Sequence, residues 1–185
     1  RQMCIRDSSM FVAASRYVFQ KAGRDQGLPE GLRGAGGQKE PAAIWGVDPV
    51  EYIQIADPWP LNPNGEIMLG LKIEDRFCLP DVDNIAAVPG ISFAEWGPGD
   101  MGMSHGDPDR HDPPYTEEMN YARELVKNAC SNSGLAFLCS WQDPNLTVEE
   151  RARHALDEEG ARILHVPEKE IADKIRREMG REMPW

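Results

Sequence analysis

Several features are scarce in this chain of 185 residues, and each scarcity excludes some classes of function. All apolar runs are too short to span a bilayer, and no signal-peptide pattern is visible. The four cysteines include no C-x-x-C pair, so neither a zinc ribbon nor a thiol redox motif is indicated. Basic residues number 20 against 31 acidic ones, which gives a formal net charge of -11. We therefore expect no nucleic acid and no membrane as partners, and the cysteine usage favours a cytoplasmic protein.

The most informative feature that is present is a pair of carboxylates, each following a short apolar run. Residues 67–73 lead into Glu74, and residues 91–96 lead through a glycine-rich turn to Asp100. A short helical pattern lies between the two runs. Because the carboxyl ends of parallel strands meet at one edge of a sheet, both acids are expected there. Two carboxylates suit a hard divalent cation such as Mg²⁺ or Mn²⁺, although a single acid at a strand end is more often solvated or caps a helix.

The remaining pattern alternates strands with helices. Apolar strands are predicted at residues 67–73, 91–96, 135–139 and 161–166. Helices with one apolar face or good capping residues are predicted at 49–56, 81–87, 117–130, 148–159 and 168–179. Continuous apolar strands are typical of a parallel sheet covered on both faces. The pattern predicts an α/β fold that is part of a TIM (β/α)₈ barrel, roughly its last four βα units, since a complete barrel needs about 250 residues.

The start of the chain does not join this pattern. Residues 1–8 read RQMCIRDS and resemble the translated read-through of a sequencing adapter. We therefore expect residues 1–9 to be non-native, and residues 10–185 to be the C-terminal part of a single (β/α)₈ domain.

Two loops have both a functional and a structural interpretation. The glycine-rich segment 23–37 could cradle a phosphate, but it lacks a preceding strand and a G-K-[ST] ending, which favours a flexible loop. Residues 105–111 contain four possible metal ligands. Pro and Gly interrupt them, which favours a surface loop.

At the two carboxylates the sequence resembles the HpcH/HpaI aldolase/citrate lyase family. The family pattern is a strand ending in I-E, a helix ending in A-V-P-G and a strand ending in G-P-x-D. Here these read Ile73-Glu74, Ala87-Val88-Pro89-Gly90 and Gly97-Pro98-Gly99-Asp100. The two acids are 100 − 74 = 26 positions apart, as in the family.

The resemblance implies a lyase, specifically a metal-dependent class II aldolase. It would cleave or form a carbon–carbon bond of a 2-oxo acid, such as a 4-hydroxy-2-oxo acid, through a pyruvate-type enolate. Glu74 and Asp100 would bind the metal (Mg²⁺ or Mn²⁺, with Co²⁺ as a further candidate). The substrate would contact Lys72 and the turn formed by Gly97, Pro98, Gly99 and Asp100. A homo-oligomer is implied for the full-length protein.

Departures from the family leave alternatives open. The catalytic His–Asp pair and the substrate-binding arginine belong to earlier strands that this sequence lacks, so its catalytic residues are unknown. Lys72 stands where many aldolases carry Gln, and its charge would repel the metal or contact the substrate. A lyase acting on citramalyl-CoA or malyl-CoA is an alternative with the same fold. A non-catalytic truncated fragment is another.

Overall fold

The structure is a computed structural model that describes residues 2–181, with side chains from Ile5 onward. Its helices are α1 (Gln2–Ser15), α2 (Lys39–Trp45), α3 (Pro49–Ile55), α4 (Val82–Ala86), α5 (Pro98–His105), α6 (Glu117–Ser133), α7 (Val148–Asp157) and α8 (Lys169–Glu178). Its strands are β1 (Pro58–Trp59), β2 (Ile67–Met68), β3 (Gly70–Lys72), β4 (Phe93–Trp96), β5 (Ala136–Cys139) and β6 (Ile163–Leu164). Two 3₁₀ turns, η1 (Arg24–Gln26) and η2 (Leu79–Asp81), complete the described part.

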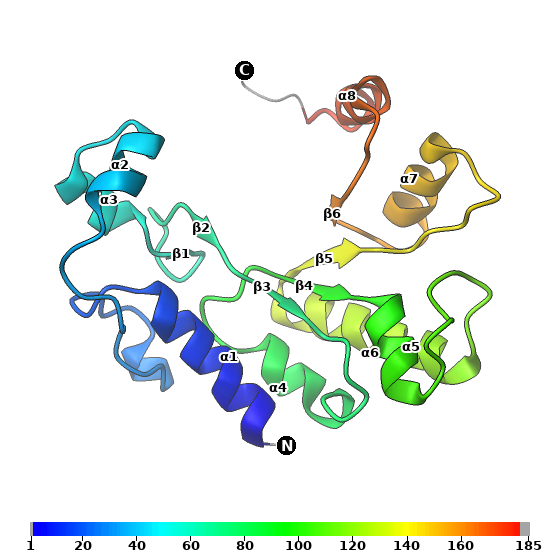
Figure 1. The fold of residues 1–185 in the computed structure, drawn as a ribbon, viewed down its shortest axis with the longest axis horizontal. Coiled ribbons are helices and arrows are strands. Elements are labelled where there is room, and N and C mark those ends of the chain that lie inside the picture. The colour runs from blue at the N-terminus through cyan, green and yellow to red at the C-terminus, as the bar shows by residue number, and fades with distance from the viewer. Residues whose placement is uncertain (1, 182–185) are drawn as a thin grey trace.

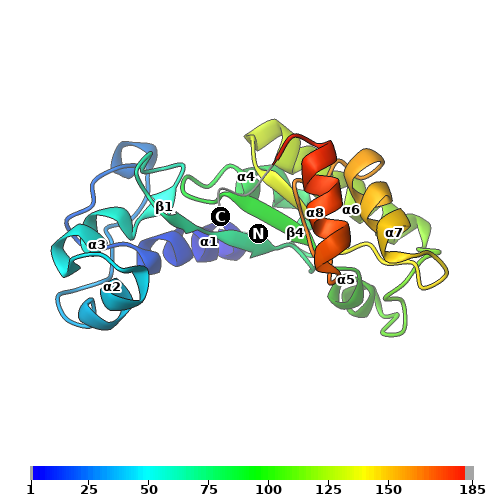
Figure 2. The same ribbon diagram turned by 90° about the horizontal axis from the view of Figure 1, so that it is seen from above.

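Four strands form an open parallel sheet in the order β3-β4-β5-β6, and β1 and β2 form a separate parallel pair. The chain therefore has the mixed α/β fold with parallel strands predicted from the sequence. In Figures 1 and 2, α2 and α3 lie at one end of an elongated molecule, and α7 and α8 lie at the other. The four-stranded sheet lies between them.

Two predicted strands are shorter than their apolar runs. Residues 67–73 divide at Leu69, because β2 pairs with β1 whereas β3 pairs with β4. Leu69 itself is buried in a cluster with Val12 and Ile91. In the run 161–166, only Ile163 and Leu164 pair with β5.

One face of the sheet carries the main core. Ala94, Trp96 and Phe137 are buried there against α4 and α6, which lie together along one side of the sheet in Figure 1. Strand residues alternate between faces, so Glu95 and Leu138 belong to the opposite face and are only half-buried. This alternation decides which side chains are available for a site.

Helix α6 shows why the sequence folds in this way. Thr116 caps its first turn by accepting a hydrogen bond from the Met119 N–H, and Gly134 ends it in the left-handed conformation with φ 70°. Between these ends, Ala122 and Val126 present an apolar stripe to the sheet. Local sequence and packing therefore agree over this helix.

Helix α1 extends through most of the segment predicted to be non-native. It runs without a break across residue 9, and Ile5 packs against two apolar clusters while Val12 is fully buried. The described part of residues 1–9 thus packs on the core. That this segment is non-native stays a prediction.

The cysteines of the described part are in two states. Cys78 is disulfide-bonded, whereas Cys130 and Cys139 are free and buried. Burial raises the pKa of each free thiol to about 11, so both are inert at neutral pH. Both free thiols belong to the main hydrophobic core. The disulfide at Cys78 differs from the reduced cysteines that the sequence favoured.

A buried ion pair joins the end of α1 to the segment that follows α3. Arg16 Nε and Nη2 donate to the two carboxylate oxygens of Asp57 at 2.7 and 3.0 Å, and Arg16 Nη1 donates to the Ala22 carbonyl at 2.6 Å. Both charged side chains are at most 1% exposed.

Within residues 2–181, no helix is long and apolar enough to cross a membrane.

We expect Asp57→Asn to lower the free energy of unfolding by roughly 3–5 kcal/mol, because Arg16 would stay buried without a carboxylate. Glu30→Gln is the control, since it removes the exposed partner of Arg24 and should change stability by less than about 1 kcal/mol. Urea denaturation followed by circular dichroism measures both variants. Equal destabilisation by the two would contradict a structural role for the buried pair.

Candidate functional site

Three charged side chains gather where β3 and β4 end. Lys72 Nζ lies 2.8 Å from Glu74 Oε1 and 3.9 Å from Glu95 Oε2. Lys72 is opposite Glu95 in the strand register, which places both on the half-buried face of the sheet. Each glutamate side chain is 16% exposed, so the acids are partly shielded from water while the Lys72 ammonium remains accessible.

Glu95 was not among the site residues predicted from the sequence. Its carboxylate accepts a hydrogen bond from the Ser140 hydroxyl, which follows β5. Glu95 thereby connects the ends of β3, β4 and β5. The available signal was a charged residue between Ala94 and Trp96 in an apolar strand, since alternation sends it to the opposite face.

Gly97 allows the Glu74 carboxylate to lie directly on the backbone. A Cβ atom at residue 97 would be 1.9 Å from Glu74 Oε1, which is far inside van der Waals contact. The backbone φ of Gly97 is -95°, a value open to any residue, so the requirement for glycine here is steric. The turn and the predicted metal-binding acid therefore fit each other closely.

Helix α5 starts at this turn and contributes Asp100. Pro98 occupies its first position and Asp100 its first turn. Met101 N–H bonds to the Gly97 carbonyl, whereas the Gly99 and Asp100 N–H groups have no partner within residues 2–181. Unpaired N–H groups at a helix start are oriented to bind an anion.

Electrostatic interactions connect Asp100 to the other charges. Burial raises the pKa of Glu74 above its usual value, and Lys72 opposes this by its hydrogen bond and charge, whereas Asp100 and Glu95 add to it. The pKa of Lys72 is raised by its hydrogen bond to Glu74 and by the charge of Glu95. Glu74, Glu95 and Asp100 thus form an acidic group around one ammonium.

The carboxylate groups of these residues are chemically suited to bind a divalent cation. Carboxylate oxygens are the donors that Mg²⁺ and Mn²⁺ prefer, and the Lys72 ammonium already lies as a cation against Glu74. Across the described residues, no group of three or more His, Cys, Asp or Glu side chains is arranged so that it could hold a metal ion. A cation here would be held by Glu74 and Asp100 with waters completing its shell.

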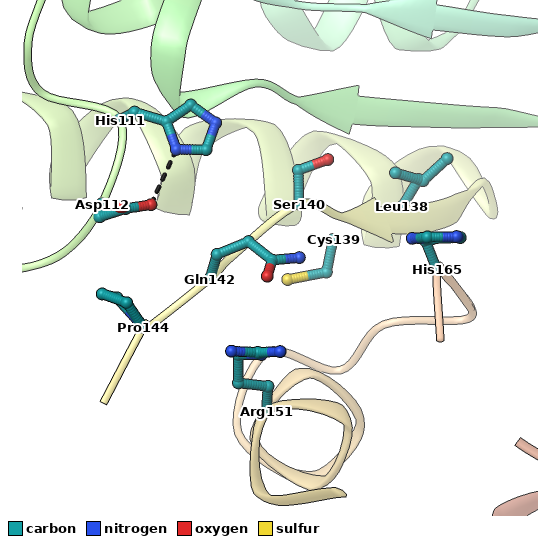
Figure 3. A pocket seen from close by; sticks show the side chains of 9 residues that line it. All are labelled: His111, Asp112, Leu138, Cys139, Ser140, Gln142, Pro144, Arg151 and His165. Atoms are coloured by element: carbon teal, nitrogen blue, oxygen red, sulfur yellow. Dashed lines mark hydrogen bonds and ion pairs between the residues drawn. The ribbon is translucent and has the colours of Figure 1, made fainter. Parts of the chain in front are cut away.

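A polar cavity of about 520 Å³ lies beside this group, at the carboxyl ends of β5 and β6 (Figure 3). Its polar lining consists of His111, Asp112, Ser140, Gln142, Arg151 and His165. These residues come from four segments that are distant in sequence. No pattern in the sequence indicates that these residues meet.

We expect Lys72→Gln to raise the pKa of Glu74 further, because it removes both the hydrogen bond and the positive charge that lower this pKa. An NMR titration of the glutamate carboxyl carbons measures the shift. Lys127→Gln is the matched control, since Lys127 pairs with Glu159 and Glu124 and should leave Glu74 unchanged. An unaltered Glu74 titration in Lys72→Gln would contradict the described geometry.

We expect Gly97→Ala to leave the chain folded but to displace the Glu74 carboxylate from Lys72, since the new methyl group would occupy its place. The same NMR titration would then show Glu74 in an altered environment. Gly34→Ala is the control, because a Cβ there would meet no atom within 4 Å. A wild-type titration curve in Gly97→Ala would show that the carboxylate does not lie on the turn.

Comparison with known proteins gives one curated relative. The hydroxypyruvate/pyruvate aldolase of Deinococcus radiodurans is 36% identical over 78 residues, which are 42% of this chain and 25% of that protein. No protein-family model matches the chain.

Solved structures cover more of the chain. An HpcH/HpaI aldolase/citrate lyase family protein from Burkholderia cenocepacia J2315 matches with a TM-score of 0.64 and 22% identity over 95% of this chain and 59% of that chain. Citrate synthase SbnG matches with a TM-score of 0.58 and 19% identity over 95% of this chain and 56% of that chain. An HpcH/HpaI aldolase from Desulfitobacterium hafniense DCB-2 matches with a TM-score of 0.51 and 22% identity over 84% and 56%.

This chain therefore spans less than two thirds of the length of these proteins. At these identities, the structural likeness concerns the fold. The resemblance predicted from the sequence is confirmed at that level: this chain has the TIM-barrel-like fold of HpcH/HpaI aldolase/citrate lyase family proteins.

Proposed function

We propose that this chain is part of a metal-dependent class II aldolase that cleaves or forms a carbon–carbon bond of a 2-oxo acid. The observation that carries the proposal is that Glu74 and Asp100 follow the ends of adjacent parallel strands, with the Glu74 carboxylate lying against Gly97. This edge is where enzymes with parallel α/β sheets place their chemistry.

The residues have distinct roles in this proposal. Glu74 and Asp100 would hold a divalent cation, Mg²⁺, Mn²⁺ or Co²⁺, which would supply Lewis-acid stabilisation of negative charge that develops on the substrate. The Gly99 and Asp100 N–H groups donate hydrogen bonds to the carboxylate of the 2-oxo acid. The turn of Gly97 and Pro98 lets the substrate approach the backbone, and Lys72 lies within reach of the same site.

Glu95 holds this arrangement in place. Its carboxylate is fixed by the Ser140 hydroxyl on one side and attracts the Lys72 ammonium on the other. Lys72 can therefore pair with Glu95 when a metal cation binds Glu74. The acidic group can in this way exchange an internal cation for a metal ion without leaving Lys72 unpaired.

The Deinococcus relative supports the substrate class, because its name specifies hydroxypyruvate and pyruvate, which are 2-oxo acids. The resemblance assigns the base and the substrate arginine to strands outside this sequence. Binding of metal and of 2-oxo acid is therefore the property we expect of this chain, and turnover is expected of the full-length homo-oligomer.

A cytoplasmic location remains part of the proposal. The free thiols of Cys130 and Cys139 support it, and the disulfide at Cys78 counts against it.

We expect the chain to bind Mn²⁺, and the double variant Glu74→Gln, Asp100→Asn to lose this binding, because amides neutralise both anionic ligands. Electron paramagnetic resonance measures free and bound Mn²⁺, and pyruvate should perturb the bound spectrum. As the pH is lowered, Mn²⁺ binding should weaken at a higher pH than it would with a glutamate ligand of ordinary pKa. The reason is that the pKa of Glu74 is raised and its protonation removes a ligand.

Asp25→Asn, Glu51→Gln is the matched control, since it removes the same two charges at exposed positions in η1 and α3. Circular dichroism establishes that all forms are folded. Equal Mn²⁺ binding by the site variant and the wild-type chain, or no binding by a folded wild-type chain, would contradict the proposal.

A further inference from the structure

His111 and Asp112 form a hydrogen-bonded pair that lines the polar cavity (Figure 3). His111 Nδ1 lies 2.7 Å from Asp112 Oδ1. Because an ionised carboxylate can only accept a hydrogen bond, Nδ1 carries the ring proton, and the neutral ring then has its lone pair on Nε2. No group within residues 2–181 is hydrogen-bonded to this Nε2. The nitrogen is therefore a free proton acceptor.

The ring of His111 lies against the turn that starts α5. A Cβ atom at Gly99 would be 3.1 Å from His111 Cδ2, which is the ring carbon bonded to Nε2. The Gly99 and Asp100 N–H groups, which are proposed to hold the substrate carboxylate, belong to the same turn. In a 2-oxo acid, C3 is two bonds from the carboxylate carbon. A substrate bound at the turn would therefore bring its C3 near the accepting side of the His111 ring.

The loop that carries His111 is anchored at both ends. The Tyr115 hydroxyl donates to the His111 carbonyl at 3.2 Å, and the Tyr115 ring packs edge-on against the buried Trp96 of β4, with ring centroids 5.2 Å apart. Toward α5, the Asp107 N–H donates to the Gly102 carbonyl at 2.8 Å. The His111 side chain is 62% exposed, so it combines a fixed backbone with access from solvent.

The other histidines of the chain lack this combination of features. His154 also lies beside a carboxylate, with Nε2 3.3 Å from Glu159 Oε1, but its ring stacks on Trp141 at a centroid distance of 3.9 Å and it does not line the cavity. His165 lines the cavity without a carboxylate partner in the described part of the chain. Among the described residues, His111 alone joins an orienting carboxylate, a free ring nitrogen and contact with the turn.

The proposed reaction requires a proton transfer at carbon. When the C3–C4 bond of a 4-hydroxy-2-oxo acid breaks, the C4 hydroxyl loses its proton and the aldehyde leaves. The two bonding electrons stay on the 2-oxo acid part, where they are shared between C3 and the C2 carbonyl oxygen. C3 must then accept a proton to give the free 2-oxo acid. A histidine ring is the side chain best suited to carry such a proton near neutral pH.

We propose that His111 is the catalytic residue that makes this transfer, with Asp112 as its positioning residue. His111 Nε2 gives a proton to C3 in the direction of cleavage and takes one from C3 in the direction of condensation, and water restores its proton. Asp112 keeps the other ring proton on Nδ1 and stabilises the charged ring. The inference rests on the proposed function, because the 2-oxo acid would bind at the Gly99 and Asp100 N–H groups.

This step can be observed without an aldehyde. In D₂O, removal and return of a proton at C3 replaces the methyl hydrogens of pyruvate by deuterium, and ¹H NMR follows the loss of the methyl signal. We expect the wild-type chain with Mg²⁺ to accelerate this exchange over Mg²⁺ alone. His111→Gln should slow the accelerated exchange by about a hundredfold. Asp112→Asn should slow it by a smaller factor, because the ring remains in place.

His154→Gln is the matched control, since it removes a carboxylate-paired histidine outside the cavity and should leave the exchange rate unchanged. A second readout is independent of rate. Pyruvate added with Mg²⁺ should shift the ring NMR signals of His111 and leave those of His154 in place. The double variant Glu74→Gln, Asp100→Asn should abolish this shift.

Exchange that is as fast in His111→Gln as in the wild-type chain would overturn the role of His111, and so would a folded wild-type chain that does not accelerate exchange. Mn²⁺ binding, measured by electron paramagnetic resonance on the same samples, separates this inference from the proposed function. Mn²⁺ binding together with exchange that is insensitive to His111→Gln overturns the inference alone. Exchange that depends on His111 in a chain that binds no Mn²⁺ supports the inference and overturns the metal site alone.

Discussion

The arrangement of the site depends on the burial of one face of the four-stranded parallel sheet. Ala94, Trp96 and Phe137 must face α4 and α6, because exposing them to water would cost more than any single polar contact returns. Since successive side chains alternate, this burial sends Glu95 to the opposite face, across from Lys72. A shift of register by one residue would exchange the core for the site. Packing on one side of the sheet therefore positions the chemistry on the other.

Close approach then brings the charges together. The absence of a side chain at Gly97 lets Glu74 lie on the backbone at the start of α5, near Asp100. Like charges at this distance repel, and Lys72 offsets the repulsion while the pKa of Glu74 is raised. One ammonium thus lies among the charges of three carboxylates. The neighbouring cavity is lined by Arg151, which has no acidic partner within residues 2–181.

Much of the fold could be predicted because local signals and tertiary packing agree. Asp48 caps α3, and Thr147 forms a capping box with Glu150 at the start of α7, as the sequence predicts. Local sequence patterns are less informative where strand pairing or packing between elements decides the structure. The run 67–73 divides because its two halves join different sheets, and helix α1 gains order from packing on the core. Neither outcome follows from apolar periodicity alone.

For the candidate site, the sequence by itself determined the residue types and the order of elements. The separation of Glu74 and Asp100 on successive strand ends follows from the strand–helix–strand pattern, because parallel strands bring their carboxyl ends to one edge. Only the tertiary structure decided that Glu95 and Ser140 join them and that Arg151 lines the neighbouring cavity. The physical reason is that register, and the helix packing that fixes it, determine which distant side chains meet. These depend on contacts between elements far apart in the chain, which no local pattern encodes.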